Sequence, residues 1–203
     1  MDTSIYRSVN AFMERTSWLH GFMAAYALWG GLVLLALLLV GTWWFSRRRP
    51  DAQALVATCI LCGVATIAAV VLSGYVISPI IRRVRPCHAI QHAATLLPCN
   101  VDYSMPSDHA IIAGAFAAGL WLVNRKLGFV AVVLAVLLAF SRVYVGVHYP
   151  SDVLVGLVAG VLIMIVLQLG LHRVVAGAAQ RLADSRWYWL VASRPSLGVL
   201  PPS

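Results

Sequence analysis

Long apolar runs alternate with short polar breaks along this chain. A bilayer core of roughly 30 Å needs about 20 helical residues to span it. Most breaks are short and rich in arginine, proline or aspartate, and one is a longer polar loop at 86–105. The pattern predicts an all-α integral membrane protein, a helical bundle of about five transmembrane helices. The predicted spans are 23–45, 53–80, 106–123, 127–146 and 152–171.

The N-terminal segment has a different pattern. Ile5, Val9, Phe12 and Met13 recur at helical spacing, with charged residues between them. This arrangement is typical of an amphipathic helix that lies in the membrane interface. A basic start followed by a short apolar core and a small-residue cleavage site is missing, so we do not expect a signal peptide.

Composition agrees with a membrane protein. Hydrophobic residues make up 61% of the chain and charged residues 11%, whereas soluble domains carry about 25% charged residues. The net charge of +8 comes from basic residues at the ends of apolar runs, not from a basic face on a soluble domain. We therefore expect no nucleic-acid partner. The 203 residues suit one membrane-embedded domain, 1–203, with a motif core at 75–170.

Basic residues predict the orientation, because cytoplasmic loops carry an excess of lysine and arginine. One side of the predicted bundle has basic residues that flank the spans, and we assign it to the cytoplasm. These residues are Arg47, Arg48, Arg49, Arg125, Lys126, Arg173, Arg181, Arg186 and Arg194. The N-terminus and the 86–105 loop then face outward. The arginines on this outer side are Arg7, Arg15, Arg82, Arg83, Arg85 and Arg142.

Three separated polar blocks reach the outer side in this topology, at 82–86, 106–109 and 141–152. Charged groups at membrane depth are costly, so those that lie there usually have a function. Arginine suits a phosphate, because its planar fork makes paired, charge-assisted hydrogen bonds.

The side chains of these blocks suit phosphoryl transfer. Ser107 is the predicted N-cap of the third span, where free N–H groups attract an anion. His109 and His148 can supply a nucleophile and a proton donor near neutral pH. Asp152 follows His148 by four residues and is expected to hold its imidazole in one tautomer.

Together the blocks resemble the motifs of the type 2 phosphatidic acid phosphatase (PAP2) superfamily, K-x6-R-P, P-S-G-H and S-R-x5-H-x3-D. The third block matches at every defined position, and the second differs only at Asp108, where glycine is commoner. The first block has Ser78 in place of the lysine. Three ordered blocks on one membrane face are far more specific than any single motif. The matching positions are Arg85, Pro86, Pro106, Ser107, His109, Ser141, Arg142, His148 and Asp152.

The missing lysine suggests a substitute. If the second span stays helical, Ser78, Arg82 and Arg85 share one face, because they are spaced by four and three residues. Arg82 is then the expected replacement cation. Arg83 is expected to point elsewhere, toward lipid phosphates.

The resemblance is strongest to the bacitracin-resistance branch. Its members are undecaprenyl-diphosphate phosphatases of the bacterial plasma membrane. It implies that His148 is the nucleophile, that Asp152 orients it, and that His109 protonates the leaving oxygen. It implies a phosphohistidine intermediate and no metal or other cofactor. The residues expected to bind phosphate are Arg85, Arg142, Ser107 and Arg82.

The four cysteines fall into two pairs. Cys59 and Cys62 lie inside the second span and are expected to pack as small apolar side chains. Cys87 and Cys99 lie in the outward loop, in a compartment where disulfides persist, and we expect them to pair.

Several alternatives stay open. The substrate could instead be phosphatidic acid, phosphatidylglycerol phosphate or another prenyl-linked phosphate, and the reaction could be phosphotransfer to a second lipid. A non-enzymatic lipid transporter would need only the arginines. A zinc-dependent hydrolase would use His88, His92, His109 and His148. Asp108 could stabilise the start of its helix or recognise the diphosphate, and the oligomeric state is left open.

Overall fold

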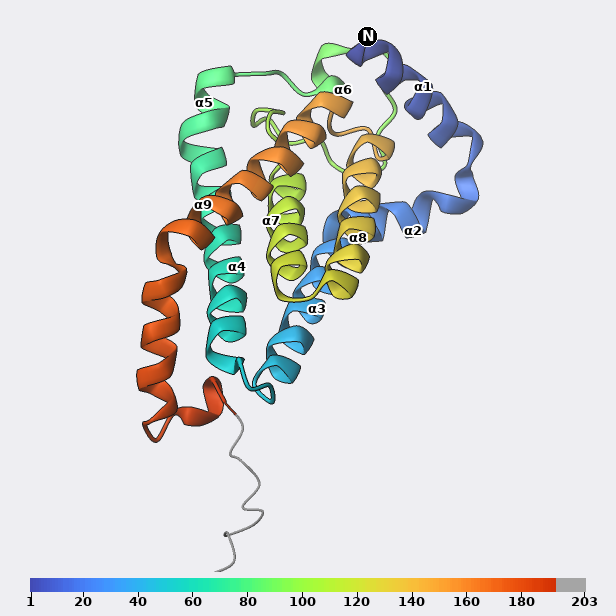
Figure 1. Ribbon diagram of the computed structural model, residues 1–203. Helices are drawn as coiled ribbons and strands as arrows, with labels where there is room; N and C mark the ends of the chain where they lie inside the picture. Colours follow the sequence, from blue (N-terminus) through green and yellow to red (C-terminus); the bar gives the residue numbers. More distant parts are fainter. Residues whose placement is uncertain (193–203) are drawn as a thin grey trace, which may run out of the picture.

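The computed structural model describes residues 1–192, and Figure 1 shows them as a bundle of helices. No strand occurs within 1–192, so the prediction of an all-helical membrane protein is confirmed. Short π-helical segments at Tyr26–Gly30 and Ser73–Ile77 extend two of the helices. The α-helices are α1 Asp2–Arg15, α2 His20–Ala25, α3 Gly31–Ser46, α4 Ala52–Leu72, α5 Ser78–Ile81, α6 Pro86–Ala89, α7 Asp108–Val123, α8 Arg125–Tyr144 and α9 Pro150–Ala183.

Each predicted span coincides with helical structure. Four helical segments are long and apolar enough to cross a membrane: Ser17–Ser46, Ala52–Ala89, Arg125–Tyr144 and Pro150–Ala183. Helix α7 is apolar but shorter, with 16 residues. Helix α9 continues to Ala183, well beyond the predicted end at 171. Hydropathy falls after 171, but no proline interrupts the backbone hydrogen bonds there, so the helix continues.

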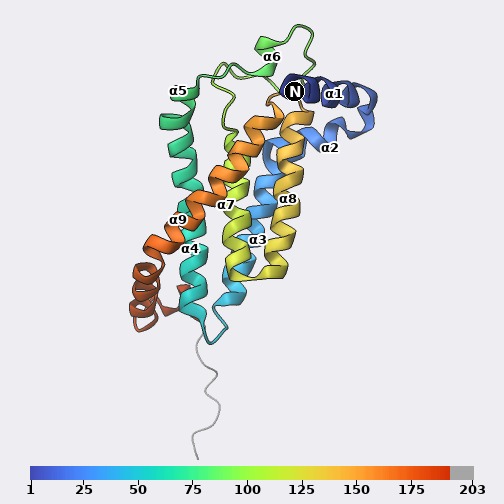
Figure 2. The same cartoon turned by 45° about the horizontal axis from the view of Figure 1, so that its top comes forward.

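Helix α7 lies in the middle of the bundle and packs against α4, α8 and α9 (Figures 1 and 2). Small residues allow this close packing, as is usual between membrane helices. A Cβ atom at Gly114 would overlap the backbone carbonyl of Leu157, and one at Gly160 would overlap that of Ile111. The α7–α9 contact therefore depends on glycines in both helices, and it holds the start of α7 beside the start of α9.

The predicted amphipathic segment forms α1, and only part of its predicted apolar stripe packs against the bundle. Tyr6, Asn10 and Met13 are buried, whereas Ile5 and Phe12 of the predicted apolar stripe are 46% and 47% exposed. The exposed apolar side chains stay available to lipid, as expected of an interfacial helix.

Polar side chains explain which face of α1 is buried. The Tyr6 hydroxyl donates a hydrogen bond to the Gly146 carbonyl at 3.1 Å. The Asn10 amide donates to the Ala94 carbonyl at 2.7 Å and accepts from the Ala94 N–H at 3.2 Å. These bonds fasten α1 to two loops of the bundle, and hydrophobic spacing alone does not reveal them.

The polar blocks meet at the end of the bundle that carries α1, which we call the α1 end. The loop from α5 to α7 and the link from α8 to α9 lie at this end (Figure 1). The links between α3 and α4 and between α7 and α8 lie toward the other end. Most of the basic residues assigned to the cytoplasm are in those links or in the C-terminal half of α9, and Arg194 is outside the described residues.

Candidate active site

His148 lies in the link between α8 and α9, and it is 2% exposed. Its Nε2 atom is 3.1 Å from Nη1 of Arg85. Its Nδ1 atom is 2.8 Å from the carbonyl oxygen of Ser104. A guanidinium can only donate and a carbonyl can only accept, so the proton is on Nδ1 and Nε2 carries a lone pair. The structure therefore presents Nε2 of His148 in the form that a nucleophile needs.

The charge state of His148 follows from its surroundings. Burial lowers the pKa of its imidazole to about 4, with help from the positive charges of Arg142 and Arg85. The Asp152 carboxylate raises the pKa of His148, but this effect is smaller than the lowering caused by burial. His148 is therefore neutral near pH 7 in the free protein.

Asp152, in the first turn of α9, has no exposed surface. One oxygen accepts the backbone N–H of Tyr149 at 2.8 Å and the hydroxyl of Ser104. The other accepts a hydrogen bond from Arg83 Nη1 at 2.7 Å. The carboxylate caps its own helix and is fully engaged by hydrogen-bond donors.

The expected direct bond from His148 to Asp152 is replaced by an indirect link. The Nδ1 atom is 3.6 Å from the carboxylate, which is outside hydrogen-bond range, and the Ser104 carbonyl is nearer. Asp152 holds Ser104 through its hydroxyl, and Ser104 holds the imidazole. The reason is local: Asp152 at the third helical position turns toward the N–H of Tyr149.

Arg85 is buried beside the histidine, at the start of α6. Besides its contact with His148, its Nη1 atom donates to the carbonyl of Val147 at 3.1 Å. Its Nε atom donates to Asp102 at 2.8 Å, and the Asp102 side chain is 55% exposed. Sequence patterns missed Asp102, because nothing in its loop distinguishes it before the loop folds.

Two further polar groups of the site have unused hydrogen-bonding capacity. Arg142, near the end of α8, donates from Nη1 to the Ala27 carbonyl at 3.0 Å. Its Nε atom and the hydroxyl of Ser107 are buried and have no hydrogen-bond partner among the described residues. Buried polar atoms are nearly always paired, so these two are suited to an anionic ligand.

A cavity of about 210 Å³ opens among these residues. Its polar lining includes Arg85, Arg142 and His109, and Leu28 and Leu97 contribute an apolar wall. The Nε2 atom of His109, in the first turn of α7, is 3.2 Å from the Leu28 carbonyl. The cavity therefore combines two cations with His109, and Arg85 in its lining is the residue that contacts Nε2 of His148.

Arg82 is not brought to this cavity. Helix α5 ends at Ile81, and Arg82 has a left-handed backbone with φ of 52°. Its side chain is exposed and donates from Nε to the carbonyl of Pro79 at 2.8 Å. The expectation that positions 78, 82 and 85 share a helical face is wrong, because the chain leaves the helix before Arg85.

Arg83 takes a different place from the one expected. Instead of facing lipid phosphates, it pairs with Asp152 and with Asp2 of α1.

Ser78, at the lysine position of the motif, donates to the carbonyl of Met105 at 3.1 Å. Asp108 accepts a hydrogen bond from Ser73 at 2.7 Å. The contact to Ser73 ties the start of α7 to the π-helical segment that follows α4.

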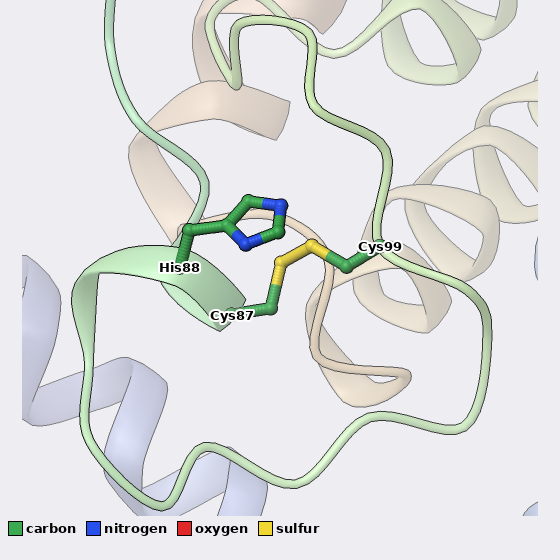
Figure 3. A group of neighbouring side chains, drawn as sticks. All are labelled: Cys87, His88 and Cys99. Atoms are coloured by element: carbon green, nitrogen blue, oxygen red, sulfur yellow. A yellow bond between two sulfur atoms is a disulfide. The ribbon is translucent and has the colours of Figure 1, made fainter.

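Cys87 and Cys99 lie next to one another, as Figure 3 shows, and the structure joins them in a disulfide. Their Cα atoms are 6.5 Å apart, within the range of natural disulfides. The link closes the loop that follows Arg85. The imidazole Nε2 of His88 is 3.0 Å from the carbonyl oxygen of Asn100 in the same loop.

The zinc site considered from sequence is not assembled. Within residues 1–192, the group of metal-binding side chains close enough to share an ion is Cys87, His88 and Cys99, and its two sulfur atoms are bonded to each other. Helix α6 ends at Ala89, so His88 and His92 do not share a helical face.

Comparison with known proteins identifies the family. The PAP2 superfamily profile matches residues 52–175. The chain belongs to the PAP2 superfamily. It is 33% identical to "Undecaprenyl-diphosphatase BcrC" of Bacillus subtilis (strain 168) over 168 residues, which cover 80% of each chain. It is 36% identical over 126 residues to an "Undecaprenyl-diphosphatase" of Sulfolobus acidocaldarius, which covers 62% of this chain and 55% of that protein.

Solved structures agree with this PAP2 fold. The crystal structure of a transmembrane PAP2 type phosphatidylglycerolphosphate phosphatase from Bacillus subtilis matches with a TM-score of 0.60 and 24% identity. The match covers 92% of this chain and 87% of the other. The family resemblance drawn from the three motifs is confirmed, and with it the predicted class, a membrane lipid phosphatase.

Proposed function

We propose that this PAP2 protein hydrolyses undecaprenyl diphosphate, or a close polyprenyl diphosphate, to the monophosphate and phosphate. The observation that carries the proposal is the Nε2 lone pair of His148 against Arg85, which lines a cavity together with His109 and Arg142. The substrate class is supported by the relatives named as undecaprenyl-diphosphatases. The proposed unit is the whole chain, 1–203, with its motif core at 75–170.

In the first step, Nε2 of His148 attacks the terminal phosphorus. A P–N bond forms, and the bond from phosphorus to the bridging oxygen breaks. His109 enters this step as its imidazolium form, and it gives one proton to that oxygen as the lipid monophosphate leaves. The Nδ1 proton stays on the ring, shared with the Ser104 carbonyl, and the negative charge of Asp152 stabilises the phosphoimidazolium.

In the second step, water attacks the phosphohistidine, and His109 takes a proton from the water. The P–N bond breaks, its electron pair returns to Nε2, and phosphate is released. Arg85, Arg142 and the hydroxyl of Ser107 would hold the phosphoryl oxygens through both steps. Preorganised donors of this kind stabilise the charge that grows in the transition state.

The proposed orientation places the α1 end of the bundle at the outer face of the bacterial plasma membrane. The exposed apolar residues of α1, such as Ile5 and Phe12, suit an interfacial position beside the cavity. A diphosphate headgroup can enter there while its polyprenyl tail remains in the bilayer. The apolar wall formed by Leu28 and Leu97 suits the first part of that tail.

The test is phosphate release from undecaprenyl diphosphate in detergent, with EDTA present. Wild type is compared with His148→Gln and with His172→Gln, a control near the opposite end of the bundle. Activity in wild type and His172→Gln, with loss in His148→Gln, supports the proposal. Activity that requires an added divalent metal contradicts it. A clear preference for phosphatidic acid or phosphatidylglycerol phosphate would replace the proposed substrate and retain the histidine chemistry.

A further inference from the structure

Arg83 connects the N-terminal helix to the buried carboxylate of the site. Its Nη1 atom donates to Asp152 Oδ1 at 2.7 Å and to the hydroxyl of Ser151 at 2.5 Å. Its Nη2 atom donates to Asp2, at the start of α1. One guanidinium therefore bridges two carboxylates that are 150 positions apart in the chain.

Asp2 is itself held firmly. It accepts hydrogen bonds from the Ser151 backbone N–H at 3.0 Å and from the Ser151 hydroxyl at 2.6 Å. Burial alone would raise the pKa of Asp2, but the hydrogen bonds from Ser151 and Arg83 outweigh it and hold the pKa below its usual range. The first turn of α1 is thus fastened, in its ionised form, to the first turn of α9.

Arg83 also contacts Ser104, the residue that lies between His148 and Asp152. Its carbonyl accepts a hydrogen bond from the backbone N–H of Ser104 at 2.8 Å, and the Ser104 carbonyl accepts one from Nδ1–H of His148. Its guanidinium stacks over the ring of Tyr149, 4.0 Å from the centroid. The residue is therefore fixed from several directions and is in contact with both groups that orient the imidazole.

Charge balance gives Arg83 a specific task. A fully buried carboxylate without a cation is costly, because it has lost its hydration. The two other arginines of the site make different contacts: Arg85 pairs with Asp102, and Arg142 donates to the carbonyl of Ala27. Among the described residues, the arginine paired with Asp152 is Arg83. Lysine could not replace it fully, since a planar fork is needed to serve two carboxylates at once.

We propose that Arg83 is a positioning residue for the pair formed by His148 and Asp152, and that Asp2 holds Arg83 in place. This inference rests on the proposed function, since it takes Asp152 as the residue that supports the nucleophile. Docking of α1 is then part of the active machinery and not only a membrane anchor. Neither residue lines the phosphate cavity, so their loss affects turnover more than substrate binding.

The experiment measures kcat and KM for undecaprenyl diphosphate in three variants: Arg83→Gln, Arg83→Lys and Asp2→Asn. The matched controls are Arg7→Gln and Glu14→Gln, which remove exposed charges of the same signs from α1. We expect kcat to fall by about 10- to 100-fold in Arg83→Gln, the usual scale for a group that supports a catalytic residue, with KM nearly unchanged. The kcat of Asp2→Asn should fall less than that of Arg83→Gln. The kcat of Arg83→Lys should lie between those of Arg83→Gln and wild type, and the controls should match wild type.

A double-mutant cycle separates positioning from general damage. If Arg83 acts through Asp152, then Arg83→Gln adds little further loss to Asp152→Asn. Independent, multiplying losses would overturn the inference, and so would wild-type kcat in Arg83→Gln or Asp2→Asn. If Arg83→Gln does not fold, as judged by thermal unfolding in detergent, the milder Asp2→Asn carries the test. Activity that survives in His148→Gln would instead overturn the proposed function itself.

Discussion

The Nδ1 atom of His148 lies 2.8 Å from the carbonyl oxygen of Ser104 and 3.6 Å from the carboxylate of Asp152. The imidazole N–H therefore donates a hydrogen bond to a backbone carbonyl. A carbonyl is too weak a base to remove the proton, so the proton stays on Nδ1. Asp152 acts one step away, through its bond from the Ser104 hydroxyl. The arrangement keeps the tautomer fixed while leaving the carboxylate charge close enough to stabilise a positive ring.

Ser104 gives the first prediction. Ser104→Ala removes the hydroxyl that donates to Asp152 but keeps the carbonyl that accepts from His148. We expect kcat to fall by about tenfold, equivalent to about 1.4 kcal/mol, with a smaller loss than in Asp152→Asn. Steady-state phosphate release in detergent measures both, with Ser185→Ala near the opposite end as control. A loss in Ser104→Ala as large as that in Asp152→Asn would contradict the indirect link.

The two arginines of the first block should behave differently. Arg85 is buried against His148, whereas Arg82 is exposed and bonded to Pro79. We expect Arg85→Gln to lower kcat/KM by at least about 100-fold, on the scale of losing one oxyanion donor, and Arg82→Gln to change it by less than about threefold. Equal losses in the two variants would restore Arg82 as a phosphate ligand.

The Ser107→Ala variant should be more stable than wild type but should bind anions more weakly. The Ser107 hydroxyl is buried and has no hydrogen-bond partner within residues 1–192, so Ser107→Ala removes an unsatisfied group. The change should raise the free energy of unfolding by about 1 kcal/mol when no anion is present. The same variant should weaken inhibition by inorganic phosphate or vanadate. Thermal unfolding with and without anion measures both effects. A variant that is less stable without anion would mean that the hydroxyl has a partner.

The low pKa of His148 predicts that the protein becomes less stable as the pH falls. The unfolded histidine binds a proton near pH 6.5, but the folded one binds it only near pH 4. Its contribution to stability is complete above about pH 6.5 and is lost as the pH falls toward 4, because the unfolded chain then binds more protons. The loss approaches about 1.4 kcal/mol per pH unit within that window.

The measurement is thermal stability in detergent between pH 5 and pH 7, for wild type and His148→Gln. We expect wild type to lose more stability than the variant as the pH falls. Parallel curves would show that the pKa of His148 is the same in the folded and the unfolded protein. NMR of protein labelled in its histidine rings would also report the neutral Nδ1–H form directly at pH 5.5.

The disulfide between Cys87 and Cys99 gives the last prediction. Unreduced protein should not react with a maleimide at either residue, and reduction should expose both. Because the bond closes the loop after Arg85, the Cys87→Ser and Cys99→Ser variants should lose stability by about 2–4 kcal/mol. Cys59 and Cys62 are buried in α4, so Cys59→Ser serves as a control for thiol loss outside the loop. Rapid labelling of Cys87 in unreduced protein would contradict the prediction.

Sequence alone determined the membrane class and the helical nature of the spans, and it proposed His109, Arg142 and His148 as candidate site residues. The physical reason is that these features are local or periodic. Hydropathy over about 20 residues reports a span directly, and motif spacing within one link or one helix turn is preserved in the fold. The end of α9 was missed because hydropathy reports the bilayer and not the continuation of a helix.

Tertiary structure alone decided which groups contact the imidazole of His148. Helix α5 stops at Ile81, so Arg82 turns outward and Arg83 turns inward, against the helical phase assumed from sequence. Ser104 acts through a backbone carbonyl, which carries no sequence signal. Asp2 reaches the site because α1 folds back across the α1 end of the bundle. These contacts join distant parts of the chain, and they depend on where loops and helix ends fall, which periodicity does not encode.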